Sequence, residues 1–202
     1  MCTQNIQMLY FRGARLMNIF IDNNVWDQLF LRNVDLNIYF PEDKYSIFVT
    51  SQGVFEVAQI PSTKKELKKY IEKYINDYVM EDSIFGFNDP NLPSDEQRVS
   101  GFGFGRFGSV VENRIRTKLA SKYESTKKRK ASQILSSQEA DIELATRSID
   151  NIVLTLDKKA GPLKDAKELG GNVVFINLSE IEGLSADEFV NYIKIKISDL
   201  KT

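Results

Sequence analysis

The chain contains no histidine among its 202 residues. This absence excludes nucleophilic catalysis by a Ser-His or Cys-His pair, zinc sites with histidine ligands, and acid–base chemistry by an imidazole ring. Any hydrolytic chemistry must therefore use carboxylates, hydroxyls, lysines or metal-bound water.

Cysteine is almost absent as well, because Cys2 is the single one in the chain. One cysteine excludes an intramolecular disulfide framework and favours a reducing compartment. No apolar run approaches the roughly 20 residues of a membrane helix, and the run that follows Arg15 stops at Asp22, too early for a signal peptide. We therefore expect a cytoplasmic protein without a membrane-spanning segment.

Net charge is nearly absent, at −1 for the whole chain, but the basic residues are unevenly placed. Between Gly101 and Leu135 there are nine basic and two acidic residues. Such a segment suits a polyanion such as nucleic acid, while a solvated helix face is the alternative reading. The residues that we expect to contact nucleic acid are Arg106, Arg114, Arg116, Lys118, Lys127, Lys128, Arg129 and Lys130.

Short apolar runs alternate with helical patterns along the chain, which predicts a three-layer α/β/α fold with a central, mainly parallel sheet. Two Ser/Thr-x-x-Glu patterns predict capping boxes, at Thr63 to Glu66 and at Ser185 to Glu188. The pattern predicts strands over 17–22, 46–50, 151–156 and 172–178, and helices over 24–31, 51–60, 63–80, 109–134, 141–149, 164–169 and from 185 onward.

The expected domain organisation is simple. Residues 1–16 read as a leader or disordered extension, residues 17–202 as one domain, and residues around 81–130 as a helical and loop insertion. The glycine-rich run over 101–105 lacks both the Lys-Ser/Thr of a phosphate loop and the spacing of a dinucleotide fingerprint. Its aromatic residues, Phe102 and Phe104 with the nearby Phe107, are read either as core residues or as contacts to nucleic-acid bases.

Four acidic residues form the most informative pattern. Asp22 and Asp157 end predicted strands, Glu56 follows another, and Asp141 opens a helical stretch. Residues at the carboxyl ends of parallel strands gather in one crevice, where two like charges about 4 Å apart repel by roughly 4 kcal/mol at an effective dielectric of 20. A cation offsets this repulsion, and a metal held only by oxygen atoms is most often Mg²⁺ or Mn²⁺.

The same residues resemble the motifs of the PIN domain, a metal-dependent nuclease fold. The four stretches that carry the resemblance, in the order found in the family, are Ile19-Phe20-Ile21-Asp22-Asn23-Asn24-Val25, Thr50-Ser51-Gln52-Gly53-Val54-Phe55-Glu56, Asp141-Ile142-Glu143-Leu144-Ala145 and Val153-Leu154-Thr155-Leu156-Asp157-Lys158. Two features depart from the family. The interval between Glu56 and Asp141 is longer than in minimal members, and the next acidic residue after Asp157 is the distant Asp165.

The resemblance implies endonucleolytic cleavage of RNA with Mg²⁺ or Mn²⁺. It implies that Asp22, Glu56, Asp141 and Asp157 are catalytic and bind the metal. Asn23 and Thr155 would not bind the metal themselves but would orient these carboxylates or the phosphate through hydrogen bonds. Glu143 and Asp150 are expected to be bystanders.

Several alternatives remain open at this point. A non-catalytic RNA-binding or scaffold protein could keep the fold. A nuclease could be the toxin of a toxin–antitoxin pair, inhibited by a small protein partner, or an RNA-processing or defence enzyme, and a homodimer is also open. A phosphatase with an Asp nucleophile is disfavoured because Asn24 stands where the second Asp is usually needed.

Overall fold

The structure is a computed structural model that describes residues 16–87, 90, 93, 97, 99–101, 105–123, 135, 138–157 and 160–201. Several sequence predictions lie outside the described residues. These are the leader over 1–15, the basic run Lys127 to Lys130, the aromatic residues Phe102 and Phe104, and the end of the helix predicted over 109–134. Within the described part, no helix has both the length and the apolar character needed to cross a membrane.

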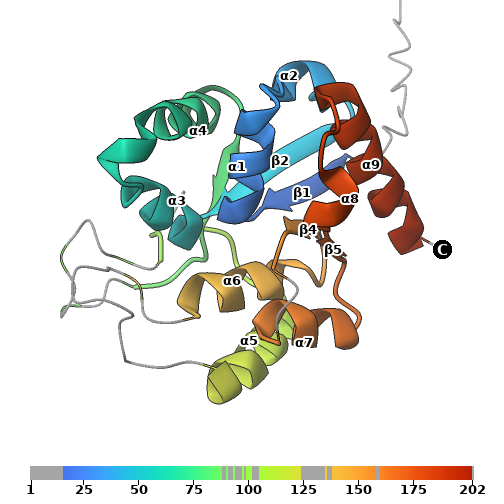
Figure 1. The fold of residues 1–202 in the computed structure, drawn as a ribbon. Helices are drawn as coiled ribbons and strands as arrows, with labels where there is room; N and C mark the ends of the chain where they lie inside the picture. Colours follow the sequence, from blue (N-terminus) through green and yellow to red (C-terminus); the bar gives the residue numbers. More distant parts are fainter. Residues whose placement is uncertain are drawn as a thin grey trace, which may run out of the picture.

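Within the described residues, one sheet of five parallel strands forms the centre of the fold, in the order β3-β2-β1-β4-β5 (Figure 1). Ile19 on β1 is aligned with Ile47 on β2 and with Ile152 on β4, so β1 is the central strand. The strands are β1 (Met17–Ile21), β2 (Tyr45–Thr50), β3 (Met80–Asp82), β4 (Ile152–Thr155) and β5 (Val173–Phe175).

Side chains alternate across this sheet and divide the core into two layers. Ile19 and Ile21 point into one cluster, while Phe20 between them belongs to the other and stacks on Phe48. Both faces are apolar because helices cover both, as expected for a parallel sheet. The predicted α/β/α arrangement is therefore confirmed.

Figure 1 shows helices α1, α3, α4 and α9 on one side of the sheet and α5, α6 and α7 on the other. The first side also includes two short helices that the sequence did not predict, α2 and α8, which place Leu36 and Ile181 in the core. The helices are α1 (Asn23–Leu31), α2 (Leu36–Tyr39), α3 (Ser51–Ala58), α4 (Lys65–Asp77), α5 (Val110–Tyr123), α6 (Glu139–Arg147), α7 (Pro162–Glu168), α8 (Leu178–Ile181) and α9 (Ala186–Ser198).

Of the two predicted capping boxes, one is confirmed and one is wrong. Ser185 accepts a hydrogen bond from the Glu188 backbone, and the Glu188 side chain accepts one from the Ser185 backbone. At the other position the chain already turns as a 3₁₀ helix over Ser62–Lys64, so Thr63 lies inside that turn and α4 begins at Lys65 without a side-chain cap.

Strand β3 also differs from the prediction, which extends the preceding helix to residue 80. Helix α4 ends at Asp77, and Met80 to Asp82 pair with the end of β2. A strand of three residues at the edge of a sheet is too short to show an alternating pattern, so its conformation depends on pairing with β2. Beyond it, isolated bridges join Ile84 to Arg106 and Phe85 to Ser100.

Candidate active site

The strand order reverses between β1 and β4, which makes their carboxyl ends the expected ligand-binding crevice of this sheet. Asp22 directly follows β1, and Asp157 stands two residues after the last residue of β4. Helix α1 starts immediately after Asp22 on one face, and α7 follows β4 on the other. The fold therefore brings both aspartates to one edge.

A hydrogen-bond network joins the two strand ends. The Asp22 Oδ2 atom accepts bonds from the Thr155 hydroxyl at 2.6 Å and from the Asn24 amide at 2.7 Å. Asn24 Oδ1 accepts the Leu156 backbone N–H at 2.9 Å, and Thr155 Oγ1 accepts that of Asp157, also at 2.9 Å. Thr155 thus holds the Asp22 carboxylate, and so does Asn24, which is not among the residues predicted for the site.

The Asp22 carboxylate is surrounded by neutral donors. Burial, with a smaller contribution from the nearby charge of Glu56, raises the pKa of Asp22 to about 6, although the hydrogen bonds from Thr155 and Asn24 offset part of the increase. Among the described residues, no lysine or arginine pairs with Asp22. Its negative charge is therefore stabilised less than that of a carboxylate in water.

Glu56 is placed beside Asp22 by helix α3. The helix starts after Thr50, whose hydroxyl accepts the Gly53 backbone N–H at 3.1 Å. The Asn23 amide then donates to Glu56 Oε2 at 2.6 Å and to the Gly53 carbonyl at 3.2 Å. Asn23 Oδ1 is buried and has no hydrogen-bond partner in the described part of the chain. Asn23 therefore orients Glu56, as Thr155 orients Asp22.

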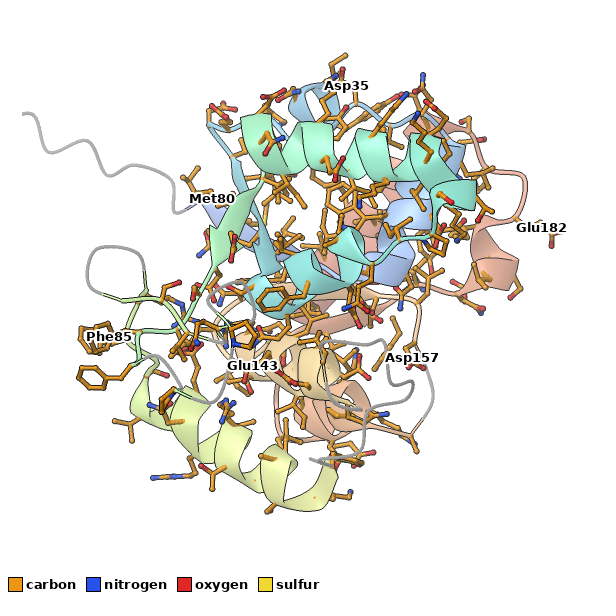
Figure 2. The ribbon with its side chains drawn as sticks, turned by 90° about the vertical axis from the view of Figure 1, so that its left-hand side faces the viewer. Asp35, Met80, Phe85, Glu143, Asp157 and Glu182 are labelled. Carbon is orange, nitrogen blue, oxygen red and sulfur yellow. The ribbon has the colours of Figure 1, made fainter. Side chains whose placement is uncertain are left out.

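Asp141 and Asp157 lie together on the other side of this edge, where they line a cavity of about 220 Å³. Asp141 lies in the first turn of α6, where the helix dipole favours negative charge. In Figure 2, Asp157 lies beside α6, below the helices of the first face. The other residues of the cavity are Gln138, Ala160, Gly161, Pro162 and Leu163.

The four predicted carboxylates thus form two pairs, Asp22 with Glu56 and Asp141 with Asp157, connected through Thr155. Among the described residues, no three acidic side chains converge closely enough to hold a metal ion together. Oxygen donors of this kind suit Mg²⁺ or Mn²⁺, and the raised pKa of Asp22 is an imbalance that a cation would relieve. The oxygen donors suit a divalent cation, and the fold places them as two pairs of carboxylates.

A second charged cluster lies beneath edge strand β3 of the sheet and was missed by the sequence predictions. Glu143, which we expect to be a bystander, is instead 3 % exposed, and both of its carboxylate oxygens accept bonds from arginines. The Arg147 guanidinium, itself fully buried, bridges Glu143 to Asp82 at the end of β3. Figure 2 shows Glu143 near the centre of the molecule. The i,i+4 spacing of Glu143 and Arg147 is the one sequence signal that could have indicated this pair.

Two of the predicted nucleic-acid contacts belong to this cluster. Arg106 bonds Asp82 at 2.6 Å and holds both oxygens of Glu112, at 2.6 and 2.9 Å. Arg116 bonds Glu143 at 2.5 Å. Three arginines and three carboxylates therefore balance one another, and the charges of Arg106 and Arg116, whose side chains are partly exposed, are paired with buried carboxylates.

The remaining predicted basic contacts divide by position. Arg114 and Lys118 are exposed on α5, whereas Lys127, Lys128, Arg129 and Lys130 lie outside the described residues. Lys122 Nζ pairs with Asp165 Oδ2 at 2.6 Å, so this acidic residue is directed toward α5. The exposed Asp150 accepts a long 3.4 Å bond from the Ser109 hydroxyl.

Comparisons of the chain with protein-family models, with curated proteins and with solved structures found no significant match. The resemblance to the PIN domain thus stays a prediction that rests on the four sequence motifs. The four carboxylates at this edge of the sheet, called the carboxylate edge below, are Asp22, Glu56, Asp141 and Asp157.

Proposed function

We propose that this protein is a metal-dependent nuclease that hydrolyses phosphodiester bonds of RNA. One observation carries the proposal: Asp22, at the switch point of the sheet, has a pKa raised to about 6 by burial and by the adjacent Glu56. Such a perturbed carboxylate in a crevice is typical of a functional site. By contrast, the buried carboxylates Asp82, Glu112 and Glu143 of the same chain all pair with arginines.

Asp22 and Glu56, with Asp157 and Asp141 beside them, would hold Mg²⁺ or Mn²⁺. When bound, such a cation lowers the pKa of a coordinated water and stabilises charge on phosphate oxygens. Asp141 and Asp157 line the cavity, and a cation held beside them would attract a phosphate to it.

The protein's own residues position the acidic groups. Thr155 and Asn24 fix one oxygen of Asp22, so the orientation of this carboxylate is set before any ligand binds. Asn23 does the same for Glu56. With a pKa of about 6, Asp22 is mostly ionised at about pH 7, which is the form that a cation binds.

The proposed activity suits a cytoplasmic RNA-processing or defence nuclease, or a toxin inhibited by an antitoxin protein. The long segment between Glu56 and Asp141, which contains α5, slightly favours the first of these, because an insertion can select the substrate. An inhibitory protein partner, or a second subunit, would act by covering the carboxylate edge.

A second candidate function is a non-catalytic RNA-binding or scaffold protein with the same fold. It is favoured by the arrangement of the carboxylates as two pairs, without a group of three acidic side chains among the described residues. This candidate needs the basic surface of α5 but does not need Asp22 or Asp157.

A cleavage assay separates the two candidates. Labelled single-stranded RNA and DNA are incubated with the protein in Mn²⁺, Mg²⁺ or EDTA. We expect RNA cleavage that EDTA abolishes. Asp22→Asn or Asp157→Asn should lower the cleavage rate by at least about 100-fold, which exceeds the usual effect of removing a residue that only hydrogen-bonds to a metal ligand. Asp187→Asn is the matched control, because Asp187 is a surface residue that accepts a bond from the Tyr39 hydroxyl. Cleavage that survives both site substitutions would show that the proposed metal site does not carry the reaction, and RNA binding without cleavage would favour the second candidate.

A further inference from the structure

A group of aromatic and apolar side chains is exposed at the beginning of α5. Phe87 is 85 % exposed, Phe107 is 75 % exposed and Val110 is 77 % exposed. Both phenylalanine rings pack on Phe85, with ring centroids at 5.9 Å for Phe87 and 4.9 Å for Phe107. Figure 2 shows Phe85 at the outer margin of the molecule, beside the start of α5. The rings therefore face solvent from a common base.

The backbone segments that carry these rings are closely packed. The Phe85 N–H donates to the Arg106 carbonyl at 2.8 Å, and the Ser100 N–H donates to the Ile84 carbonyl at 3.0 Å. A Cβ atom on Gly105 would lie 2.7 Å from backbone atoms of Phe85 and Ser100, so this glycine permits the close approach of three segments. Exposed rings on a fixed backbone lose little conformational entropy when a flat partner stacks on them.

The adjoining surface of α5 is positively charged. Its one acidic residue, Glu112, is buried against Arg106, so no carboxylate of α5 faces solvent. Arg114 follows Val110 by four residues and Lys118 follows Arg114 by four, which places the three on one side of the helix. The apolar group thus continues directly into a row of cations.

The row leads toward the candidate active site. At the end of α5, Lys122 pairs with Asp165 on α7. Helix α7 begins at Pro162, which lines the cavity together with Asp157. A ligand that extends along α5 is therefore directed to the helix that borders the carboxylates.

We propose that the aromatic–basic surface, formed by Phe87, Phe107, Arg114 and Lys118, binds single-stranded RNA. Unpaired bases stack on the two rings, and phosphates lie along α5. This combination of aromatic platforms and a cationic track is the usual basis of single-strand binding. The choice of RNA over DNA rests on the proposed nuclease function, whereas stacking and charge alone fit any single strand.

Two other occupants fit less well. In a symmetric dimer the same patch meets itself, so the cations of α5 would face those of the partner helix. Double-stranded nucleic acid keeps its bases stacked inside the helix and offers no base face to Phe87 or Phe107. Charge complementarity and the exposed rings together select an unpaired polyanion.

The aromatic part of the surface is tested by fluorescence anisotropy in EDTA, with labelled oligouridine of about 12 nucleotides, within the range of single-strand site sizes. We expect Phe87→Ala and Phe107→Ala each to weaken binding by about 5- to 150-fold, and Phe107→Trp to retain it. The matched controls are Leu31→Ala and Ile38→Ala, because both residues are 73 % exposed elsewhere on the surface. Their affinity should equal that of the wild type. Circular dichroism checks that each variant is folded.

The basic part of the surface is tested by the salt dependence of the same binding. The double variant Arg114→Ala/Lys118→Ala should reduce the slope of log affinity against log salt by about 0.7 for each phosphate that the protein no longer neutralises. Lys65→Ala/Lys73→Ala on α4 is the control, since both lysines are exposed on the other side of the sheet. The control should leave the slope unchanged.

The outcomes separate this inference from the proposed function. If Asp22→Asn leaves cleavage intact while Phe107→Ala loses binding, the proposed metal site fails and the proposed RNA-binding surface stands. The proposed binding surface is contradicted if the wild type does not bind oligouridine or binds duplex RNA equally well. It is also contradicted if both phenylalanine variants bind oligouridine as tightly as the wild type. The proposal also fails if the phenylalanine substitutions change the oligomeric state but leave RNA binding unchanged. Tighter binding of oligodeoxyuridine than of oligouridine would contradict the assignment to RNA.

Discussion

The chain contains two clusters of acidic side chains that are treated in opposite ways. In the cluster beneath β3, Asp82, Glu112 and Glu143 are matched by Arg106, Arg116 and Arg147. At the carboxylate edge, Asp22 is held only by neutral donors and faces Glu56. Each carboxylate of the first cluster has an arginine partner, whereas Asp22 has no cationic partner among the described residues.

This difference shows in the pKa of each cluster. Arg106 lowers the pKa of Glu112 despite its burial, whereas burial raises that of Asp22 to about 6. A paired buried carboxylate stabilises the fold only as long as its partner is present. An unpaired one destabilises the fold until a ligand supplies the missing charge. The comparison therefore assigns a structural role to the first cluster and supports the proposed binding role of Asp22.

The largest expected effect is the removal of a cation from the paired cluster. Arg147→Met leaves Asp82 and Glu143 without their buried partner, which should lower the free energy of unfolding by about 3–5 kcal/mol. Lys196→Met is the matched control, because its pair with Glu180 lies on the surface. Chemical denaturation measures both, and the control should be indistinguishable from the wild type. An Arg147→Met protein as stable as the wild type would show that the cluster is not structural.

Asp22, which has no cationic partner among the described residues, should respond in the opposite direction. The folded pKa of Asp22 lies above its unfolded value of about 4, so the wild type loses stability as pH rises from about 4 to about 6. Asp22→Asn does not carry this charge and should be about 1–3 kcal/mol more stable than the wild type above about pH 6. The gain should disappear below about pH 4. Urea denaturation across this pH range checks the sign, and a destabilised variant at neutral pH would contradict it.

Packing next to the paired cluster should be sensitive to one atom. Gly105 precedes Arg106, and an added Cβ would press on the backbone of Phe85 and Ser100. Gly105→Ala should therefore destabilise the protein by about 1–3 kcal/mol. Gly101→Ala is the control, since a Cβ there meets no atom within 4 Å. Thermal unfolding should separate the two variants, and equal melting temperatures would show that the close approach is not required.

The helix cap at Ser185 is distant from both clusters, so its removal measures a purely local effect on stability. Ser185→Ala removes the confirmed capping box of α9 and should cost about 1 kcal/mol. Thr63→Ala should have almost no effect, because Thr63 does not cap α4. The two substitutions can be compared in one denaturation series, where a larger loss for Thr63→Ala would contradict the observed helix start.

The sequence predicts the elements that carry their own pattern. The buried strands β1, β2, β4 and β5 are visible as short branched apolar runs, and the capping box of α9 is visible as a residue pattern. Strand β3 and the short helices α2 and α8 are not, because they are stabilised by neighbours that are distant in sequence. Thr63 shows the same limit, since the preceding Pro61 starts a turn that a local motif does not reveal.

The carboxylate edge is predictable for the same reason that the strands are. Asp22 and Asp157 follow apolar runs, and parallel strands bring their carboxyl ends together. The role of Asn24 is not predictable, because its contacts to Asp22 and Leu156 depend on the separation of β1 from β4. Glu143 looks like a surface residue of α6 because its partner Arg116 comes from α5, and only its pair with Arg147 on the same helix has a sequence signal.

The central claim is that the carboxylate edge binds a divalent cation, and thermal unfolding in Mn²⁺ at about pH 7 tests it most directly. We expect Mn²⁺ to stabilise the wild type in a concentration-dependent manner, by about 2.7 kcal/mol at a hundred times the dissociation constant. Asp187→Asn should keep this response, and Asp22→Asn should lose it. A wild type whose melting temperature is insensitive to Mn²⁺, or an Asp22→Asn protein that is stabilised equally, would contradict the account.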